Sequence, residues 1–217
     1  DLGCAGGHYL NFLSQFFPQK QFVGVDVDEG FIKLARERFS KGGTFICTDA
    51  CNFNISKFNY VIVRAVLQHL TDEQYLVQSL EKWIKPSTRI AFFDHDPHFT
   101  PVYDPPILAI AHIHRMIAKW QKKKGGDRSR LENFIKSCAN FGFEIEMHEK
   151  PRYDCVNEFD KNLFARYELA KAAIISKRFD IKIDLSKVAQ DISDWLNTSH
   201  SHAIQGCGQW VVVKKKK

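Results

Sequence analysis

Long apolar runs are absent from this sequence. No stretch approaches the ~18 consecutive apolar residues that a membrane-spanning helix requires, so we expect no membrane span. Paired cysteine motifs are absent too, because none of the six cysteines stands in a Cys-x-x-Cys arrangement. Scattered single cysteines are typical of reduced thiols rather than of a disulfide framework, and they favour a cytoplasmic protein.

A start signal is also missing. The chain has no initiator methionine and no signal peptide, and it opens on residues typical of the end of a strand. A parallel-sheet domain needs the rest of that strand and a helix to cover it. We therefore expect a segment on the order of 30 residues to precede Asp1.

Length and composition indicate a folded globular protein. A chain of 217 residues suffices for one well-buried domain and is too short for two ordinary ones. Hydrophobic residues make up 44% and charged residues 26%, which argues against disorder. The 18 phenylalanines indicate a core with much aromatic surface.

Positive charge is unevenly distributed along the chain. The formal net charge is +6, with four lysines at 214–217 and another cluster between Lys119 and Arg130. A basic patch can bind nucleic acid, but a solvated helix end and a soluble tail have the same composition. We expect a solvated helix end and a soluble tail, and nucleic acid is the less favoured partner.

Strand and helix signals alternate over the first hundred residues. Apolar residues at Phe31, Ile32, Leu34, Ala35 and Phe39, for example, have helical spacing. The expected strands cover 21–27, 44–48, 59–64 and 89–93, and the expected helices cover 11–17, 29–39 and 72–84, the last with Thr71 as N-cap. This alternation predicts an α/β fold, doubly wound, with a mostly parallel sheet and helices on both faces.

The second half of the chain departs from that alternation. Prolines between 97 and 106 mark a loop, and helices are expected over 107–123, 130–140, 157–179 and 186–196. Strands are expected at 143–147 and 209–213. We interpret residues 1–217 as a single domain, with helical lid segments at about 104–124 and 157–205 that shape a substrate pocket.

The opening sequence Asp1-Leu2-Gly3-Cys4-Ala5-Gly6-Gly7 lies where a first strand would end and a helix begin. Glycines at such a place allow a ligand to approach the backbone closely. A dinucleotide motif would need glycine at positions 5 and 8, where this chain has Ala5 and His8. Asp1 would repel a pyrophosphate but suits a cation. The loop therefore favours S-adenosylmethionine, which carries a sulfonium and an ammonium, over a dinucleotide.

Two later acids support an adenosine ligand. Asp26 closes the second strand, where a carboxylate can accept both ribose hydroxyl protons. Its neighbour Asp28 competes for that role, but it also suits the N-cap of the next helix, which is the reading we favour. Asp49 ends the third strand and can accept from the adenine amine, with Phe53 packing the ring, or it can simply cap the loop.

The order Asp-x-Gly-Cys-x-x-Gly, Val-Gly-Val-Asp, Asp-Ala and Arg-x-Val-Leu-Gln-His-Leu resembles the class I, Rossmann-like S-adenosylmethionine-dependent methyltransferases. It looks most like the branch that acts on small molecules. The match covers about residues 1–95, with weaker agreement at 125–143 and at the last strand. The resemblance implies cofactor contacts from Asp1, Gly3, Cys4, Ala5, Asp26, Val27, Asp49, Ala50 and Arg64.

The sequence departs from the family pattern in two places. Ala5 replaces the middle glycine of the loop, which narrows it, and Pro86-Ser87 replaces a Pro-Gly-Gly turn. The resemblance also implies that Arg64 lies at the carboxylate end of the methionine part of the cofactor. Gln68 and His69 are expected to be structural, at the start of a helix below the site.

Candidate catalytic residues follow the fifth expected strand. A general base helps when the acceptor is a hydroxyl or a protonated amine, and Asp94 and His95 are the best candidates. The pattern Asp94-His95-Asp96-x-His98 can also be read as a metal site, as can His200-x-His202 with Cys207. Neither has the spacing of a structural zinc site, so no metal is expected.

Several functions remain open on the sequence alone. The motif Asn-Pro-Pro-Tyr after the fourth strand is absent, as is a Pro-Cys nucleophile, which favours a small-molecule acceptor. The alternatives are an RNA or protein methyltransferase that uses the basic 119–130 segment, and a non-catalytic S-adenosylmethionine-binding protein. A dinucleotide oxidoreductase is a more distant alternative.

Overall fold

The computed structural model describes residues 1–39, 41–99, 101–178, 182–206 and 208–216. The chain divides into two compact units. Unit 1 comprises Asp1–Asp96, Gly126–Lys150 and Gly208–Lys217, and unit 2 comprises Pro97–Gly125 and Pro151–Cys207. Each unit has its own hydrophobic core.

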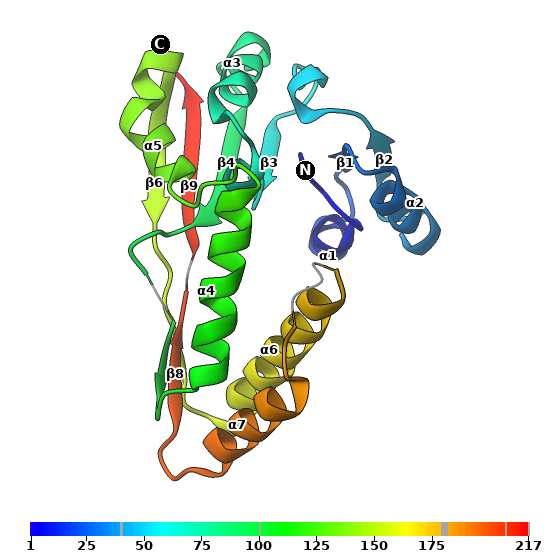
Figure 1. Cartoon of the computed structure of the whole chain (residues 1–217). Helices are drawn as coiled ribbons and strands as arrows, with labels where there is room; N and C mark the ends of the chain where they lie inside the picture. Colours follow the sequence, from blue (N-terminus) through cyan, green and yellow to red (C-terminus); the bar gives the residue numbers. More distant parts are fainter. Residues whose placement is uncertain (40, 100, 179–181, 207, 217) are drawn as a thin grey trace. The chain divides into compact units, whose positions relative to one another are not determined.

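Unit 1 is built on an open sheet (Figure 1). Its strands are β1 (Val23–Asp26), β2 (Thr44–Cys47), β3 (Tyr60–Arg64), β4 (Arg89–His95), β6 (Phe143–Glu149) and β9 (Gly208–Lys215). β1 pairs with β2 and β3 pairs with β4, both in parallel, while β9 runs antiparallel between β4 and β6. Leu2 forms parallel bridges to Val25 and Val63, so the opening segment joins β1 to β3.

Helices cover both faces of this sheet. They are α1 (His8–Phe16), α2 (Glu29–Arg38), α3 (Glu73–Trp83) and α5 (Arg130–Ser137). In β1 the buried Val25 packs in the core that contains residues of α3 and α5, whereas Gly24 abuts Leu10 of α1 and Phe45. Because successive strand residues point to opposite faces, α1 and α3 lie on opposite sides of the sheet. The doubly wound α/β class expected from the sequence is confirmed.

Several boundaries differ from those expected. The first helix begins at His8, since Gly7 takes φ 77° before it, and the strand expected over 21–27 is confined to Val23–Asp26. The helix expected over 130–140 is α-helical only to Ser137 and continues as a 3₁₀ turn, η3 (Cys138–Phe141). Two further 3₁₀ turns are η1 (Ala50–Asn52) and η2 (Leu67–His69).

The expected N-cap of α3 was wrong by one residue. Asp72, not Thr71, precedes the first helical residue, and its carboxylate accepts the N–H of Gln74 at 2.9 Å. Both residue types are good N-caps. Sequence alone could not choose between two neighbouring caps.

Unit 2 contains both helices and a small sheet. The helices are α4 (Leu108–Lys123), α6 (Glu158–Arg178) and α7 (Leu185–Asn197), close to the expected bounds, although Phe179 lies outside the described residues. The sequence predicted no strands here, and that was wrong. β5 (Val102–Asp104), β8 (His202–Gln205) and β7 (Tyr153–Cys155) form an antiparallel sheet in the order β5-β8-β7. Strands of three or four residues are too short to show an alternating pattern.

The core of unit 2 is aromatic at its centre. Trp195 of α7 packs edge-on against Phe164 of α6, and Phe164 stacks on Tyr103 of β5. The Trp195 indole N–H donates to the carbonyl of Asp104 at 3.2 Å. Within the described ranges, no helix is long and apolar enough to cross a membrane.

Candidate cofactor and active site

The opening loop is held against β1 by its backbone. The amides of Gly3 and Cys4 both donate to the carbonyl of Val25, at 2.7 and 2.9 Å. Gly3 has φ 78°, and a Cβ there would lie 2.3 Å from a methyl group of Val66. A side chain at Gly7, with φ 77°, would lie 2.7 Å from the ring of Phe45. Both glycines are therefore required by the fold as well as suited to a ligand.

Ala5 links this loop to the end of β1. It takes φ 46°, a left-handed conformation that a non-glycine residue adopts at a cost. Its N–H donates to Oδ2 of Asp26 at 2.8 Å. The alanine that departs from the family pattern is thus anchored by the acid expected to bind ribose.

Asp26 combines a structural role with spare hydrogen-bonding capacity. Its other oxygen, Oδ1, accepts the N–H of Asp28 at 2.9 Å. A carboxylate has about four lone-pair sites, so each oxygen can still accept from a hydroxyl. Asp28 caps α2 by accepting the N–H of Phe31 at 3.0 Å, which confirms the N-cap expected from the sequence. Val27, between the two acids, exposes 74% of its surface.

Asp49 lies at the end of β2 and is exposed. Its Oδ1 accepts the N–H of Cys51 at 2.8 Å and so begins the η1 turn, while Ala50 is half-buried. The loop-capping alternative for Asp49 is confirmed by this contact.

Two charged side chains have buried atoms that form no hydrogen bond with a described residue. Both carboxylate oxygens of Asp1 are buried without a hydrogen bond, and so is Nε of Arg64. The Arg64 guanidinium lies 4.6 Å from the centre of the Tyr9 ring, a cation–π contact. A buried ionised carboxylate without a partner is costly, so Asp1 fits a site for a cationic group. Arg64 correspondingly offers a donor to an anionic group.

The expected catalytic pair stands at the end of β4. Asp94 is only 2% exposed, and its carboxylate accepts the amides of Gln68 at 3.1 Å and His95 at 2.9 Å. Burial raises the pKa of Asp94 to about 6, although these backbone hydrogen bonds and the charge of Arg128 oppose the shift. A carboxyl group with that pKa can exchange a proton near neutral pH. Its contact with Gln68 also holds η2 in place.

The structure adds partners of Asp96 and His95 that the sequence did not reveal. Asp96, 1% exposed, accepts from Nζ of Lys150 at 3.3 Å. Gln209 of β9 donates to the carbonyl of His95 at 3.3 Å, and its own carbonyl lies 2.9 Å from the ring of His148. These partners are far apart in the sequence, so no local motif could have indicated them.

The segment after α4 reaches the same edge of the sheet. The N–H of Asp127 donates to the carbonyl of Gln68 at 3.0 Å. Burial, and then the charge of Arg128, lower the pKa of His69. The imidazole of His69 is therefore kept neutral at neutral pH. The weak agreement at 125–128 in the sequence thus corresponds to a segment that supports η2.

Parallel pairing explains why these residues gather at one edge. Asp26, Asp49, Arg64 and His95 are at or just beyond the carboxyl ends of β1, β2, β3 and β4. The carboxyl ends of parallel strands share an edge, which is where α/β proteins bind ligands. Among the described residues, no cluster of three histidine, cysteine or acidic side chains could hold a metal ion. Cys207, part of one metal alternative, lies outside the described residues.

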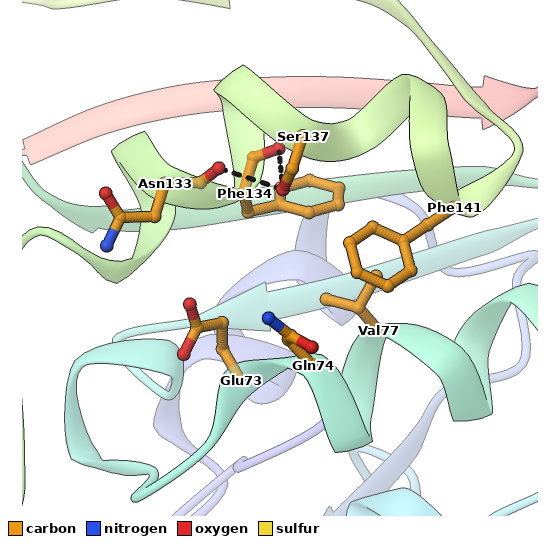
Figure 2. Close-up of a pocket in the computed structure, with 7 residues that line it drawn as sticks. All are labelled: Glu73, Gln74, Val77, Asn133, Phe134, Ser137 and Phe141. Atoms are coloured by element: carbon orange, nitrogen blue, oxygen red, sulfur yellow. Dashed lines mark hydrogen bonds between the residues drawn. The ribbon is translucent and has the colours of Figure 1, made fainter.

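A separate cavity of about 310 Å³ lies between α3 and α5 (Figure 2). Its lining residues are Glu73, Gln74, Val77, Asn133, Phe134, Ser137 and Phe141. Glu73 pairs with Arg130, and the Ser137 hydroxyl donates to the carbonyls of Asn133 and Phe134. The serine has no histidine beside it in this lining, so the cavity contains no activated nucleophile.

Comparison with known proteins agrees with this arrangement. Residues 1–92 match the family described as "Methyltransferase domain". The trans-aconitate 2-methyltransferase of Yersinia pseudotuberculosis is 33% identical over 92 residues, which are 42% of this chain and 35% of that protein. A malonyl-[acyl-carrier protein] O-methyltransferase of Priestia megaterium is 26% identical over 94 residues, 42% of this chain and 34% of that protein. The chain thus spans about a third of the curated relatives it matches.

Solved structures share the fold over the whole chain. The Haemonchus contortus phosphoethanolamine N-methyltransferase 2 in complex with S-adenosyl-L-methionine matches with a TM-score of 0.57 and 18% identity, covering 100% of this chain and 48% of that one. The YcgJ protein of Bacillus subtilis matches with a TM-score of 0.59 and 14% identity, covering 100% and 91%. At such identities the likeness concerns the fold. Residues 1–92 are thus similar to a methyltransferase domain, and the chain as a whole has a Rossmann-like fold that solved methyltransferases share.

Proposed function

We propose that this chain is the catalytic part of an S-adenosylmethionine-dependent methyltransferase with a small-molecule acceptor. The observation that carries the proposal is the buried Asp1 carboxylate, which has no hydrogen-bond partner in the described structure. S-adenosylmethionine offers cationic groups to such a carboxylate and has no phosphate for it to repel. The small-molecule names of the matched relatives support the choice of acceptor class.

The proposed cofactor contacts follow the carboxyl edge of the sheet. Gly3, Cys4 and Ala5 border the methionine and ribose part, and Asp26 with Val27 holds the ribose. Asp49 and Ala50 bind the adenine. Arg64, whose Nε is buried without a partner in the described structure, binds the methionine carboxylate.

Methyl transfer requires that the acceptor be oriented toward the methyl group more than that it be chemically activated. When bound, the cofactor supplies an electrophilic methyl group, and an oxygen, nitrogen or carbon atom of the acceptor displaces a neutral thioether from it in line. Holding the two reactants in that line can supply on the order of 7–11 kcal/mol. The acceptor proton passes to a base, for which we propose Asp94 or His95. The raised pKa of Asp94, about 6, suits that role.

We propose that two helical segments of unit 2 determine which acceptor can bind. The helical segments 104–124 and 157–205 lie within unit 2, and we retain them as lid elements of one functional domain. None of the five described cysteines is in a disulfide, which supports a reducing, cytoplasmic location.

A nucleic-acid acceptor is less favoured because the basic 119–130 segment is divided between the units, and Arg130 is engaged by Glu73 and the carbonyl of Thr71.

Replacing the ribose acid tests the cofactor assignment. Asp26→Ala should weaken S-adenosylmethionine binding at least about tenfold, because charge-assisted hydrogen bonds to the ribose hydroxyls are lost. Isothermal titration calorimetry with S-adenosylmethionine and S-adenosylhomocysteine measures the change.

Asp28→Ala is the matched control, two residues away. It removes the cap of α2 and should lower the free energy of unfolding by about 1 kcal/mol while leaving cofactor affinity nearly unchanged. Unchanged binding in Asp26→Ala would refute the ribose assignment. Equal losses of affinity in both variants would point to a general loosening of the loop instead.

A further inference from the structure

The helix α6 is apolar on its outer side as well as on its inner side. The inner side packs in the core of unit 2 through Phe164 and Ala172, and Phe164 contacts Trp195 of the neighbouring α7 (Figure 1). A surface helix ordinarily has a polar side opposite its buried side, whereas a helix that is apolar all round is ordinarily buried. α6 therefore has the composition of a helix that is covered on both sides.

Exposed apolar residues follow one another along the whole outer side. This outer stripe consists of Phe159, Leu163, Tyr167, Ala170, Ala173 and Ile174. Its four large members each expose between 57% and 76% of their surface. Residues three or four positions apart are neighbours on a helix, so the stripe is continuous. The exposed polar residues Asn162 and Arg166 border it. Exposed apolar surface with a polar border is typical of a protein–protein interaction site.

One ring of the outer stripe also has a contact within its own chain. Nζ of Lys171 lies 5.0 Å from the centre of the Tyr167 ring and 2.6 Å from the carboxylate of the buried Glu168. The lysine is thus held on the side of the core. Tyr167 still exposes 61% of its surface, so the ring has area left for a neighbour from outside.

Open space borders the same stripe. A cavity of about 690 Å³ lies between the β7–β8 strand pair and the first half of α6, and Leu163 and Tyr167 both line it. The half-open strand wall includes Tyr153 of β7, which is 61% exposed. Side chains of another molecule therefore have room to pack against α6 from this direction.

The outer stripe has the spacing of a coiled-coil seam. Leu163, Tyr167, Ala170 and Ile174 are successively four, three and four residues apart. Positions a and d of a heptad repeat alternate in the same way, and they form the contact between two supercoiled helices. The occupant that fits this spacing is another α-helix.

Charge indicates which helix fits and in which direction. Steps of three residues extend the seam to the half-buried Asp160 at one end and to the exposed Lys177 at the other. In an antiparallel pair of α6 helices, Asp160 of each chain would lie opposite Lys177 of the other. In a parallel pair, like charges would meet at both ends. Opposite charges across an interface favour association and like charges disfavour it, so a second α6 fits in the antiparallel direction.

The antiparallel arrangement also matches the apolar side chains in size. It would place Leu163 opposite Ile174 of the other chain and Tyr167 opposite Ala170. A large ring that faces a methyl group fills the space between two helices. A parallel pair would instead bring the two tyrosines together and leave the two alanines facing each other.

We propose that the outer stripe of α6 is the interface of a homodimer, in which α6 of a second copy of this chain packs antiparallel against it. Such an interface is isologous, because the same surface of both chains meets about a two-fold axis, as in most dimers of identical chains. The inference concerns unit 2 and goes beyond the proposed function, on which it does not depend.

The mass of the full chain in solution tests the dimer. Sedimentation equilibrium between about 1 and 200 μM should show a mass that rises from that of one chain to that of two. The mass of one chain at every concentration would overturn the proposal.

A charge placed in the outer stripe tests the position of the interface. Leu163→Glu should raise the dissociation constant of the dimer at least about tenfold, because an unpaired carboxylate is buried at two symmetric places. Leu108→Glu is the matched control, since Leu108 is a 73% exposed leucine of α4 outside the stripe, and it should leave the dissociation constant unchanged. Far-UV circular dichroism checks that both variants are folded. A dimer of wild-type affinity in Leu163→Glu would place the interface elsewhere and refute the proposal.

Exchanging the end charges tests the direction of the helices. Lys177→Asp should raise the dissociation constant about fivefold, because the new carboxylate faces Asp160 of the other chain. The double change Asp160→Lys and Lys177→Asp should return the dissociation constant to within about twofold of the wild-type value, because opposite charges meet again at both ends. In a parallel pair, each of these variants would keep like charges at both ends. No loss of affinity in Lys177→Asp, or no recovery in the double variant, would contradict the antiparallel interface.

Discussion

Individual acids at the carboxyl edge of the unit 1 sheet serve two purposes. Asp26, Asp49 and Asp94 each accept at least one backbone N–H, and each was also expected to act on cofactor or substrate. A carboxylate with several lone pairs can hold a loop and still bind a ligand. The structural and functional interpretations of such a residue are therefore not exclusive.

Asp94 gives a prediction about pH. Its folded pKa of about 6 is above the ordinary value of 3.8, because burial disfavours the charged form. The folded protein holds this proton when the unfolded chain has lost it, so the contribution to stability is present below about pH 4 and is lost as pH rises through about 6. That loss amounts to about 3 kcal/mol.

Asp94→Asn removes this titration. Relative to the variant, the wild-type free energy of unfolding should fall by about 3 kcal/mol between about pH 3 and pH 7, measured by urea denaturation at a series of pH values. The comparison uses the change of the free energy of unfolding with pH. The free energy lost when the carboxylate acceptor is replaced by an amide is the same at every pH, so it does not affect this change. Parallel curves for the two proteins would show that the carboxyl is already ionised throughout.

At the scale of elements, substitutions at the beginning of α3 test which of two neighbouring residues is its N-cap. Asp72→Ala should lower the free energy of unfolding by about 1 kcal/mol, because the N–H of Gln74 loses its acceptor. Thr71→Ala should be nearly neutral, since the contact made by Thr71 is through its carbonyl, which accepts from Arg130. Thermal and urea unfolding of the two variants measure the difference, and a larger loss in Thr71→Ala would contradict the assignment.

The short strands of unit 2 could not be predicted from the sequence. β5 and β8 pair over three residues each, although about a hundred positions separate Tyr103 from Ala203. Such short segments carry little local preference, and they become strands because pairing satisfies their backbone groups. The long helices α4 and α7 were recognisable because several turns of apolar spacing repeat the same signal.

At the scale of the whole molecule, the two cores predict two unfolding transitions. Phe134 is buried in unit 1 and Ile192 in unit 2, and the two cores share no residue. Contiguous cores of this kind commonly open as separate cooperative units. Urea unfolding should therefore give different midpoints for a chain retaining only Trp210, in unit 1, and a chain retaining only Trp195, in unit 2.

Substitutions in each core assign each unfolding transition to one of the two units. Ile192→Ala should destabilise the Trp195 transition by about 2–5 kcal/mol and leave the Trp210 transition almost unchanged, whereas Phe134→Ala should do the reverse. Coincident midpoints that shift together in both variants would show that the chain unfolds as one cooperative unit.

The sequence by itself indicated the fold class and the kind of ligand that we propose. The alternation of strands and helices over residues 1–95 and the order of Asp1, Asp26, Asp49 and Arg64 follow from local patterns, which short-range chemistry imposes on the chain. Only the tertiary structure decided which groups are buried without partners, because that depends on residues distant in sequence. It left the Asp1 carboxylate and Gln205 Nε2 without partners among the described residues, and it joined His95 to Gln209. It also formed the cavity of unit 2, whose walls come from a strand pair and a helix that no local pattern brings together.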